Sequence, residues 1–114
     1  MKNTSTDNAE KLQTKEQFKA EIARWAVVMK AKPAQIRVQR MTKKWASCSD
    51  KGWVSFSADL LREPKTFQDY VIAHELLHLQ VPNHGKLFKS LMNAYLPGWE
   101  NILAERNGSV ARSL

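Results

Sequence analysis

Two histidines and a glutamate lie close together near the middle of the chain. His74 and His78 are four positions apart, and Glu75 lies between them. On an α-helix this spacing advances by about 400°, so the two imidazoles project about 40° apart and one turn along the helix. Both rings can then bind one metal ion, and Glu75 is near enough to meet a water on that ion. The HExxH pattern is typical of zinc-dependent metalloproteases.

The third histidine of the chain, His84, is the candidate for a third metal ligand. It follows His78 by six positions, and a straight helix would turn it by about 600°, pointing it away. A bend at Pro82-Asn83 can fold it back. A catalytic zinc takes three protein ligands and a water, so His74, His78 and His84 supply the expected number.

Other interpretations of these residues remain open. Glu100, 22 positions after His78, is an alternative third ligand, because one branch of zinc proteases takes a Glu from the helix after the motif. The histidines could instead be hydrogen-bonded core residues or hold a structural zinc. A structural site has four ligands, mostly cysteines, and the sequence has one, Cys48. Cys48 fits a small buried residue, or a fourth zinc ligand in a latent form.

The helix that carries the motif is the most strongly specified element. It is expected over 66–80, with Thr66 as N-cap and Asp69 in the first turn, and it is apolar almost all round. Such a helix belongs in the centre of a domain. Pro82 ends it.

The remaining elements predict an α+β fold. Thr14 and Gln17 form a capping box for an N-terminal helix that ends before Pro33. Three segments then read as a small, mainly antiparallel three-stranded sheet, with a hairpin turn at 49–52. The expected strands are 35–41, 44–48 and 53–57, followed by a helical turn at 58–62, a helix at 85–95 that buries Leu87, Phe88, Leu91 and Met92, and a last helix through Trp99, Ile102 and Leu103.

Length and composition limit the class of protein. The 114 residues predict a single domain over 14–107, with a disordered tail at 1–13 and a frayed one at 108–114. No apolar run approaches the roughly 18 residues of a membrane span, and the start lacks the apolar stretch of a signal peptide. The lone cysteine favours a reducing, cytoplasmic location. A net charge of +7 would attract nucleic acid or acidic substrates.

The sequence resembles the YgjP-like metallopeptidase domain, a zincin-like family related to the SprT-like and Wss-type metalloproteases. The resemblance spans about 36–100 and rests on the segments 44–49, 52–56 and 69–79, with Asn83, His84 and Phe88. The family usually has Arg-Trp-Gly-Ser-Cys, where this chain has Lys44 and Ala46 in place of Arg and Gly. The resemblance implies a minimal zincin-like fold, zinc held by its three histidines, and Glu75 as the catalytic acid/base.

Further roles follow from that chemistry as hypotheses. Tyr70 or Tyr95 could stabilise the oxyanion, although core packing suits both, and Asn83 or Asp69 could hold the second nitrogen of a ligand imidazole. The strand pair that ends at 55–57 is expected to border the cleft, where an extended peptide could add to its free edge. Trp45 and Trp53 are expected in the core, with the cleft wall as the alternative.

The expected partner is a peptide or protein substrate, and several alternatives remain. A basic face could bind nucleic acid, as in a DNA-associated SprT-like protease. The enzyme could instead hydrolyse a nucleotide pyrophosphate, or be latent. The oligomeric state is left open. The residues assigned to the basic face are Arg37, Arg40, Lys43, Lys44 and Lys51.

Overall fold

The computed structural model describes residues 13–107, apart from the side chains of residues 103 and 105–107. The predicted tails lie outside this part, except for Gln13, whose side chain accepts a hydrogen bond from Gln68 Nε2 at 2.9 Å. In chain order the elements are α2 (Lys15–Met29), β1 (Gln35–Gln39), β2 (Ala46–Cys48), β3 (Trp53–Ser57), the 3-10 helix η1 (Ala58–Arg62), α3 (Lys65–Leu77), α4 (Lys86–Tyr95) and α5 (Trp99–Asn107).

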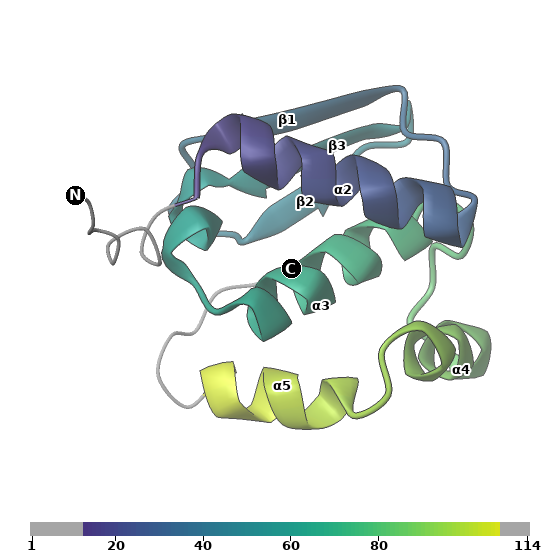
Figure 1. The fold of residues 1–114 in the computed structure, drawn as a ribbon. Coiled ribbons are helices and arrows are strands. Elements are labelled where there is room, and N and C mark those ends of the chain that lie inside the picture. Colours follow the sequence, from purple (N-terminus) through teal and green to yellow (C-terminus); the bar gives the residue numbers. More distant parts are fainter. Residues whose placement is uncertain (1–12, 108–114) are drawn as a thin grey trace.

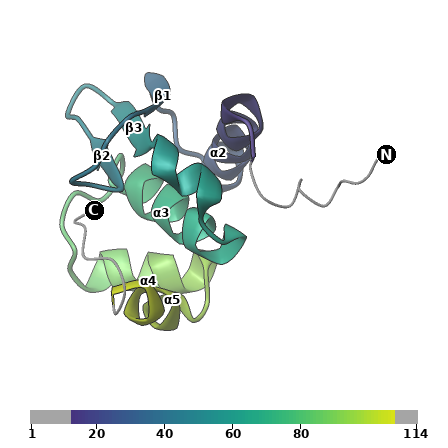
Figure 2. The same ribbon diagram turned by 90° about the vertical axis from the view of Figure 1, so that its left-hand side faces the viewer.

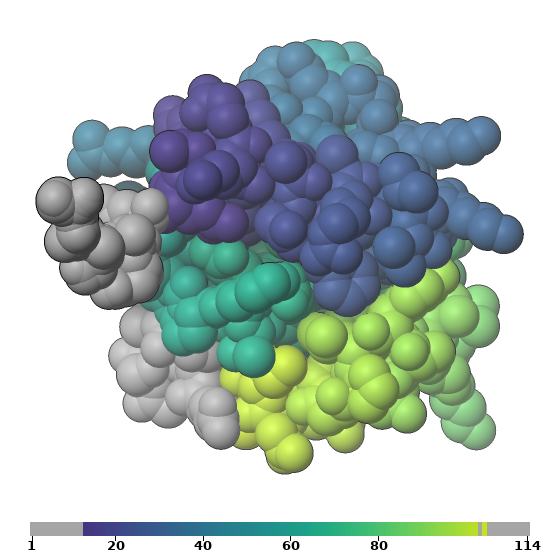
Figure 3. Space-filling view, viewed as in Figure 1, coloured from purple at the N-terminus to yellow at the C-terminus, as the bar shows by residue number. Residues whose placement is uncertain are grey.

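Helix α3 occupies the centre of the fold. It contacts α2 and β2 on one side and α4 and α5 on the other, so the sheet with α2 forms one layer and the C-terminal helices form the opposite one (Figures 1 and 2). In the space-filling view, α2 and the C-terminal helices border the teal part of the chain that reaches this face (Figure 3). The α+β prediction, with a motif helix between a small sheet and the C-terminal helices, is confirmed.

The sheet is mixed rather than mainly antiparallel. Its strand order is β1-β3-β2, in which β3 pairs parallel to β1 and antiparallel to β2. Two parallel strands need a connection that returns the chain to the starting end of the sheet. Residues 40–52 make this connection, and β2 within them runs in the opposite direction to β1 and β3. Alternating residues indicate which face of a strand is buried but not which strand is its neighbour, so the prediction of a mainly antiparallel sheet missed the parallel pairing of β1 with β3.

The hairpin between β2 and β3 forms as the turn residues predict. The Gly52 N–H donates to the Ser49 carbonyl at 3.0 Å, and the Ser49 N–H donates to the Trp53 carbonyl at 2.9 Å. Gly52 adopts φ +85°, a conformation that side chains rarely allow. A Cβ there would lie 3.4 Å from the Ala34 nitrogen, a contact the neighbouring chain tolerates, so it is the backbone conformation of the turn that favours glycine.

Helix α2 begins with the predicted capping box and covers the sheet. The Gln17 N–H donates to Thr14 Oγ1 at 3.0 Å, and the Thr14 N–H donates to Gln17 Oε1 at 2.9 Å. Phe18 is fully buried and meets the ring of Phe56 edge-on, with centroids 5.9 Å apart. This contact joins the helix to the central strand of the sheet. The side chains of α2 that are buried are Phe18, Ile22, Ala26 and Met29.

The motif helix begins and ends earlier than predicted. Its N-cap is Pro64 instead of Thr66, and Asp69 accepts hydrogen bonds from Trp25 Nε1 at 3.2 Å and from Lys65 Nζ at 3.0 Å. The acid therefore ties α3 to α2 instead of capping the helix. The α-helix ends at Leu77, after which the N–H groups of His78, Leu79 and Gln80 bond three residues back, the tighter pattern typical of a helix end.

Two expectations about buried side chains are corrected. Leu87 is 61% exposed, because α4 buries only the narrow stripe of Phe88 and Met92, while Leu91 is half-buried. Trp53 is 41% exposed and lies under the Arg37 guanidinium, 4.8 Å from its carbon, on the sheet face that α2 and α3 do not cover.

Trp45 and the last helix agree with expectation. Trp45 is buried against Phe67, with centroids 5.1 Å apart. In α5, Trp99 and Ile102 pack on the core, whereas the side chain of Leu103 lies outside the described part. No helix within residues 13–107 combines the length and apolar character needed to cross a membrane.

Replacing Phe18 with alanine should destabilise the fold strongly, because it leaves a cavity between α2 and the sheet. We expect a loss of about 3–5 kcal/mol in the free energy of unfolding, measured by urea denaturation. Val27→Ala is the control on the same helix. Val27 is 78% exposed, so its change should stay within about 0.5 kcal/mol. Equal losses for the two variants would contradict the packing of α2 described above.

Candidate metal centre

Three imidazoles meet beside the end of α3. His74 is buried in the last turn of α3, and His78 is the C-cap of that helix. His84 reaches back from the loop before α4. The Nε2 atom of His84 lies 3.1 Å from that of His74 and 2.9 Å from that of His78. The ligand nitrogens all lie within 4.8 Å of one another. The chain therefore does bend at 79–83, as the predicted third ligand requires.

This arrangement of nitrogens fits a bound metal ion. Three nitrogens about 2.05 Å from one tetrahedral ion lie about 3.3 Å apart, close to the observed separations. Hydrogen bonds alone explain it poorly, because a neutral imidazole carries one N–H and Nε2 of His84 has two nitrogen neighbours at once. Three imidazole nitrogens placed this close together could hold one metal ion, which is the site that the spacing of the histidines predicts.

The outer nitrogen of His74 has a partner that favours metal binding. His74 Nδ1 lies 3.1 Å from Glu75 Oε2. An ionised carboxylate only accepts, so Nδ1 carries the proton and Nε2 keeps a lone pair for a metal. The ring of His78 is hydrogen-bonded to the backbone of Val81.

The electrostatics keep the more open rings neutral. Burial lowers the pKa of His78, and the positive charge that His74 can carry lowers it further. Burial, followed by His74, also lowers the pKa of His84. Because a metal ligand must be unprotonated, lowered pKa values favour coordination at neutral pH.

Phe88 of α4 supports all three rings. Its centroid lies 5.1, 4.9 and 4.8 Å from the three imidazoles in chain order. The sequence predicts a buried Phe88 but not this contact. The available signal was its position four residues after His84, which places Phe88 in the first turn of α4, just after the loop that carries His84.

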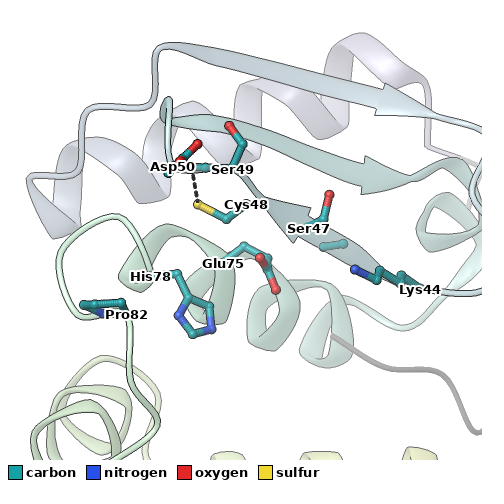
Figure 4. A pocket seen from close by; sticks show the side chains of 9 residues that line it. Lys44, Ser47, Cys48, Ser49, Asp50, Glu75, His78 and Pro82 are labelled. Carbon is teal, nitrogen blue, oxygen red and sulfur yellow. Dashed lines mark hydrogen bonds between the residues drawn. The ribbon is translucent and has the colours of Figure 1, made fainter.

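A cavity of about 370 Å³ opens beside the imidazoles (Figure 4). Strand β2 forms one wall, and Glu75 with His78 forms the other. Glu75 is only 2% exposed but lines this cavity, so its carboxylate is both buried and next to the space a substrate could enter. The sequence predicted that the strand pair ending at 55–57 would border the cleft. The strand of that pair that lines the cavity is β2, because β3 lies in the middle of the sheet.

Cys48 points from β2 into the cavity, across from Glu75 and His78 (Figure 4). Its Sγ lies 3.7 Å from the Ser49 carbonyl oxygen. Burial raises the pKa of the thiol, and the nearby charge of Glu75 raises it further, so the thiol favours its protonated form. Cys48 is not part of the cluster of potential ligands found within the described residues.

The rival ligand lies elsewhere. Glu100 is exposed on α5 and borders a separate depression with Lys89 and Asn93. It does not join the three imidazoles in the cluster found among residues 13–107.

The other candidate residues have mainly structural surroundings. Tyr70 is buried, stacks on Trp99 with centroids 6.0 Å apart, and has its pKa raised to about 12 by burial and then by Glu75. Tyr95 packs half-buried against the core. Asp69 is engaged with Trp25, and Asn83 is exposed, so the ring partners are Glu75 and Val81 instead.

Comparison with known proteins decides the family. The model of the YgjP-like metallopeptidase domain matches residues 2–106, which is nearly the whole chain. The chain belongs to the YgjP-like metallopeptidase family. The family expected from the motifs is thereby confirmed, and the protein is a metallopeptidase.

Two solved structures share the fold of this YgjP-like metallopeptidase. The metallopeptidase zymogen abylysin of Pyrococcus abyssi matches with a TM-score of 0.73 and 17% identity, over 85% of this chain and 98% of that one. The metallopeptidase zymogen jannalysin of Methanocaldococcus jannaschii matches with a TM-score of 0.68 and 19% identity, over 78% and 95%. A search of curated protein sequences finds no match. At these identities the structures support the fold alone.

His84→Ala and Glu100→Ala separate the two candidate third ligands. Nε2 of His84 lies beside both other ring nitrogens. Removing this imidazole should weaken zinc binding by more than about 100-fold, because removing a residue that only hydrogen-bonds a metal ligand already costs about 10- to 100-fold. Glu100→Ala should bind zinc like the unaltered protein. Competitive titration with a chelator measures both affinities, and the reverse ranking would assign the third position to Glu100.

Proposed function

We propose that this metallopeptidase is a zinc enzyme in which His74, His78 and His84 hold the ion and Glu75 acts as general base. The observation that carries the proposal is the convergence of three Nε2 atoms at the edge of an open cavity. A site closed by four protein ligands would be structural, whereas three ligands beside a cavity leave a position for reaction.

Zinc is the ion that best suits the donor set. Imidazole also binds copper, iron and nickel, but three histidines with a water in the fourth place are typical of catalytic zinc. Zinc bound here would polarise the scissile carbonyl and lower the pKa of a water. Activity in the presence of added zinc, copper, iron or nickel would identify the metal.

Glu75 moves the proton in this proposal. A carboxylate oxygen would accept a proton from the attacking water and deliver it to the leaving amine. Burial within α3 keeps the carboxylate close to the ring of His74 and limits its rotamers. The other carboxylate oxygen can meanwhile keep accepting the hydrogen bond from His74 Nδ1. One side chain would then act as the general base and also orient the imidazole of His74.

The free edge of β2 is suited to hold the substrate. In the order β1-β3-β2, one side of β2 has no strand beside it within the described sheet, and this strand forms a cavity wall. An extended peptide could pair with the backbone of Ala46–Cys48 and bring a peptide bond over Glu75 and His78. A peptide or protein substrate is therefore proposed.

The alternative functions stay predictions. The residues of the suggested basic face, Arg37, Arg40, Lys43, Lys44 and Lys51, are all exposed, as nucleic-acid binding would require. Hydrolysis of a nucleotide pyrophosphate gains no further support. The two structural neighbours are zymogens, which keeps a latent form of this chain in consideration. The cytoplasmic location and the single domain over 14–107 are likewise predictions.

Two substitutions of Glu75 test its dual role. Glu75→Gln keeps an oxygen that can accept from His74 Nδ1 but cannot take up a proton, so peptide hydrolysis should be lost while zinc affinity stays within about threefold. Glu75→Ala removes the acceptor as well, and zinc affinity should fall about 10-fold or more. Peptide cleavage and chelator titration measure the two effects. Full activity of the glutamine variant would refute the assigned base.

A further inference from the structure

A second cavity lies next to the cavity beside the metal centre. This second cavity, about 430 Å³, lies beyond the hairpin turn and reaches the end of α2. Ser49, Asp50 and His78 line both cavities, so the two lie next to each other. A peptide lying along β2 and extending past His78 would therefore pass beside the second cavity.

Three lysines from separate parts of the chain surround the second cavity. They are Lys30 at the C-cap of α2, Lys32 in the loop before β1, and Lys51 in the hairpin turn. Only Asp50 supplies a negative charge to the lining, so the cavity is positive overall. All three lysine side chains are exposed, and no ion pair ties them to a carboxylate within residues 13–107.

Backbone hydrogen bonds hold two of these lysines in place. Lys30 has φ +57°, and its N–H donates to the carbonyls of the last turn of α2. Its own carbonyl accepts from Gln80 Nε2 at 3.1 Å, which joins the end of α2 to the chain just after the motif helix. The Lys51 N–H donates to Ser49 Oγ at 3.3 Å. The backbone atoms of Lys30 and Lys51 are therefore fixed at the border of one cavity.

We propose that this second cavity is a substrate subsite that selects an acidic residue of the peptide, on the side of the scissile bond that lies over the hairpin turn. The inference rests on the proposed function. Three ammonium groups around a space next to the site would attract a substrate carboxylate during its approach and would pair with it once the peptide is bound. A peptide is favoured over nucleic acid because most of the basic face on the sheet, Arg37, Arg40 and Lys43, lies outside both cavities.

Cleavage of a peptide mixture by the zinc-loaded protein tests this subsite. The mixture contains matched peptides with Asp, Gln or Lys at each position around the scissile bond, and mass spectrometry measures kcat/KM for each. The unaltered protein should prefer the acidic peptide about 10-fold at one position, an effect expected from a few partly exposed charge pairs. The preference should shrink at 0.5 M salt.

Two variants assign the preference to these lysines. K30Q/K32Q/K51Q should lose the acidic preference while still cleaving the neutral peptide at a similar rate. K32E/K51E should favour the lysine-containing peptide. The control K15Q/K19Q/R62Q removes the same amount of positive charge from exposed residues that line neither cavity, and it should keep the preference. Thermal unfolding checks that all variants fold.

The possible failures are distinguishable. Equal cleavage of acidic and neutral peptides by the unaltered protein would overturn the subsite but leave the peptidase function intact. No cleavage of any peptide would overturn both. Binding of a single-stranded oligonucleotide that is lost in K30Q/K32Q/K51Q but not in the control, without an acidic preference among peptides, would assign the lysines to nucleic acid and overturn the inference.

Discussion

The convergence of three imidazole nitrogens is the constraint on which the rest of this structure depends. Two of the rings share one face of a buried helix, so their separation follows from helix geometry. The third must return from beyond the helix end, which is possible because α3 stops at Leu77 and tightens over the next residues. Phe88 then holds α4 against all three rings. The central position of α3, packed between the sheet and the C-terminal helices, keeps this geometry rigid.

A buried carboxylate in the centre of a small domain has a substantial energetic cost, and its surroundings explain why it is tolerated. Glu75 is almost fully buried, and an unpaired charge at such a position would destabilise the fold. Its contact with His74 Nδ1 supplies a polar partner, and a cation held by the imidazoles would supply opposite charge nearby. The same residue also raises the pKa values of Cys48 and Tyr70. Metal binding, stability and the chemistry proposed for the cavity are therefore linked through one side chain.

Much of this could be predicted from the sequence, because the relevant signals are local. The capping box at Thr14, the glycine turn at 49–52 and the four-residue spacing of His74 and His78 each depend on neighbouring residues. The parallel pairing of β1 with β3 depends on which distant strand is adjacent, and no local pattern encodes it. Asp69 looked like a helix cap, but a tertiary contact with Trp25 determines its position. The second cavity was missed for a similar reason, since its three lysines are brought together only by the fold.

The most direct test of the central claim is X-ray absorption spectroscopy of the zinc-loaded protein. It reports the number, type and distance of the ligand atoms around the ion without requiring catalysis. The account predicts three histidine nitrogens at about 2.0 Å and, as the fourth donor, the oxygen of an exchangeable water molecule. A shell that includes sulfur at about 2.3 Å, or four protein ligands with no exchangeable position, would contradict it.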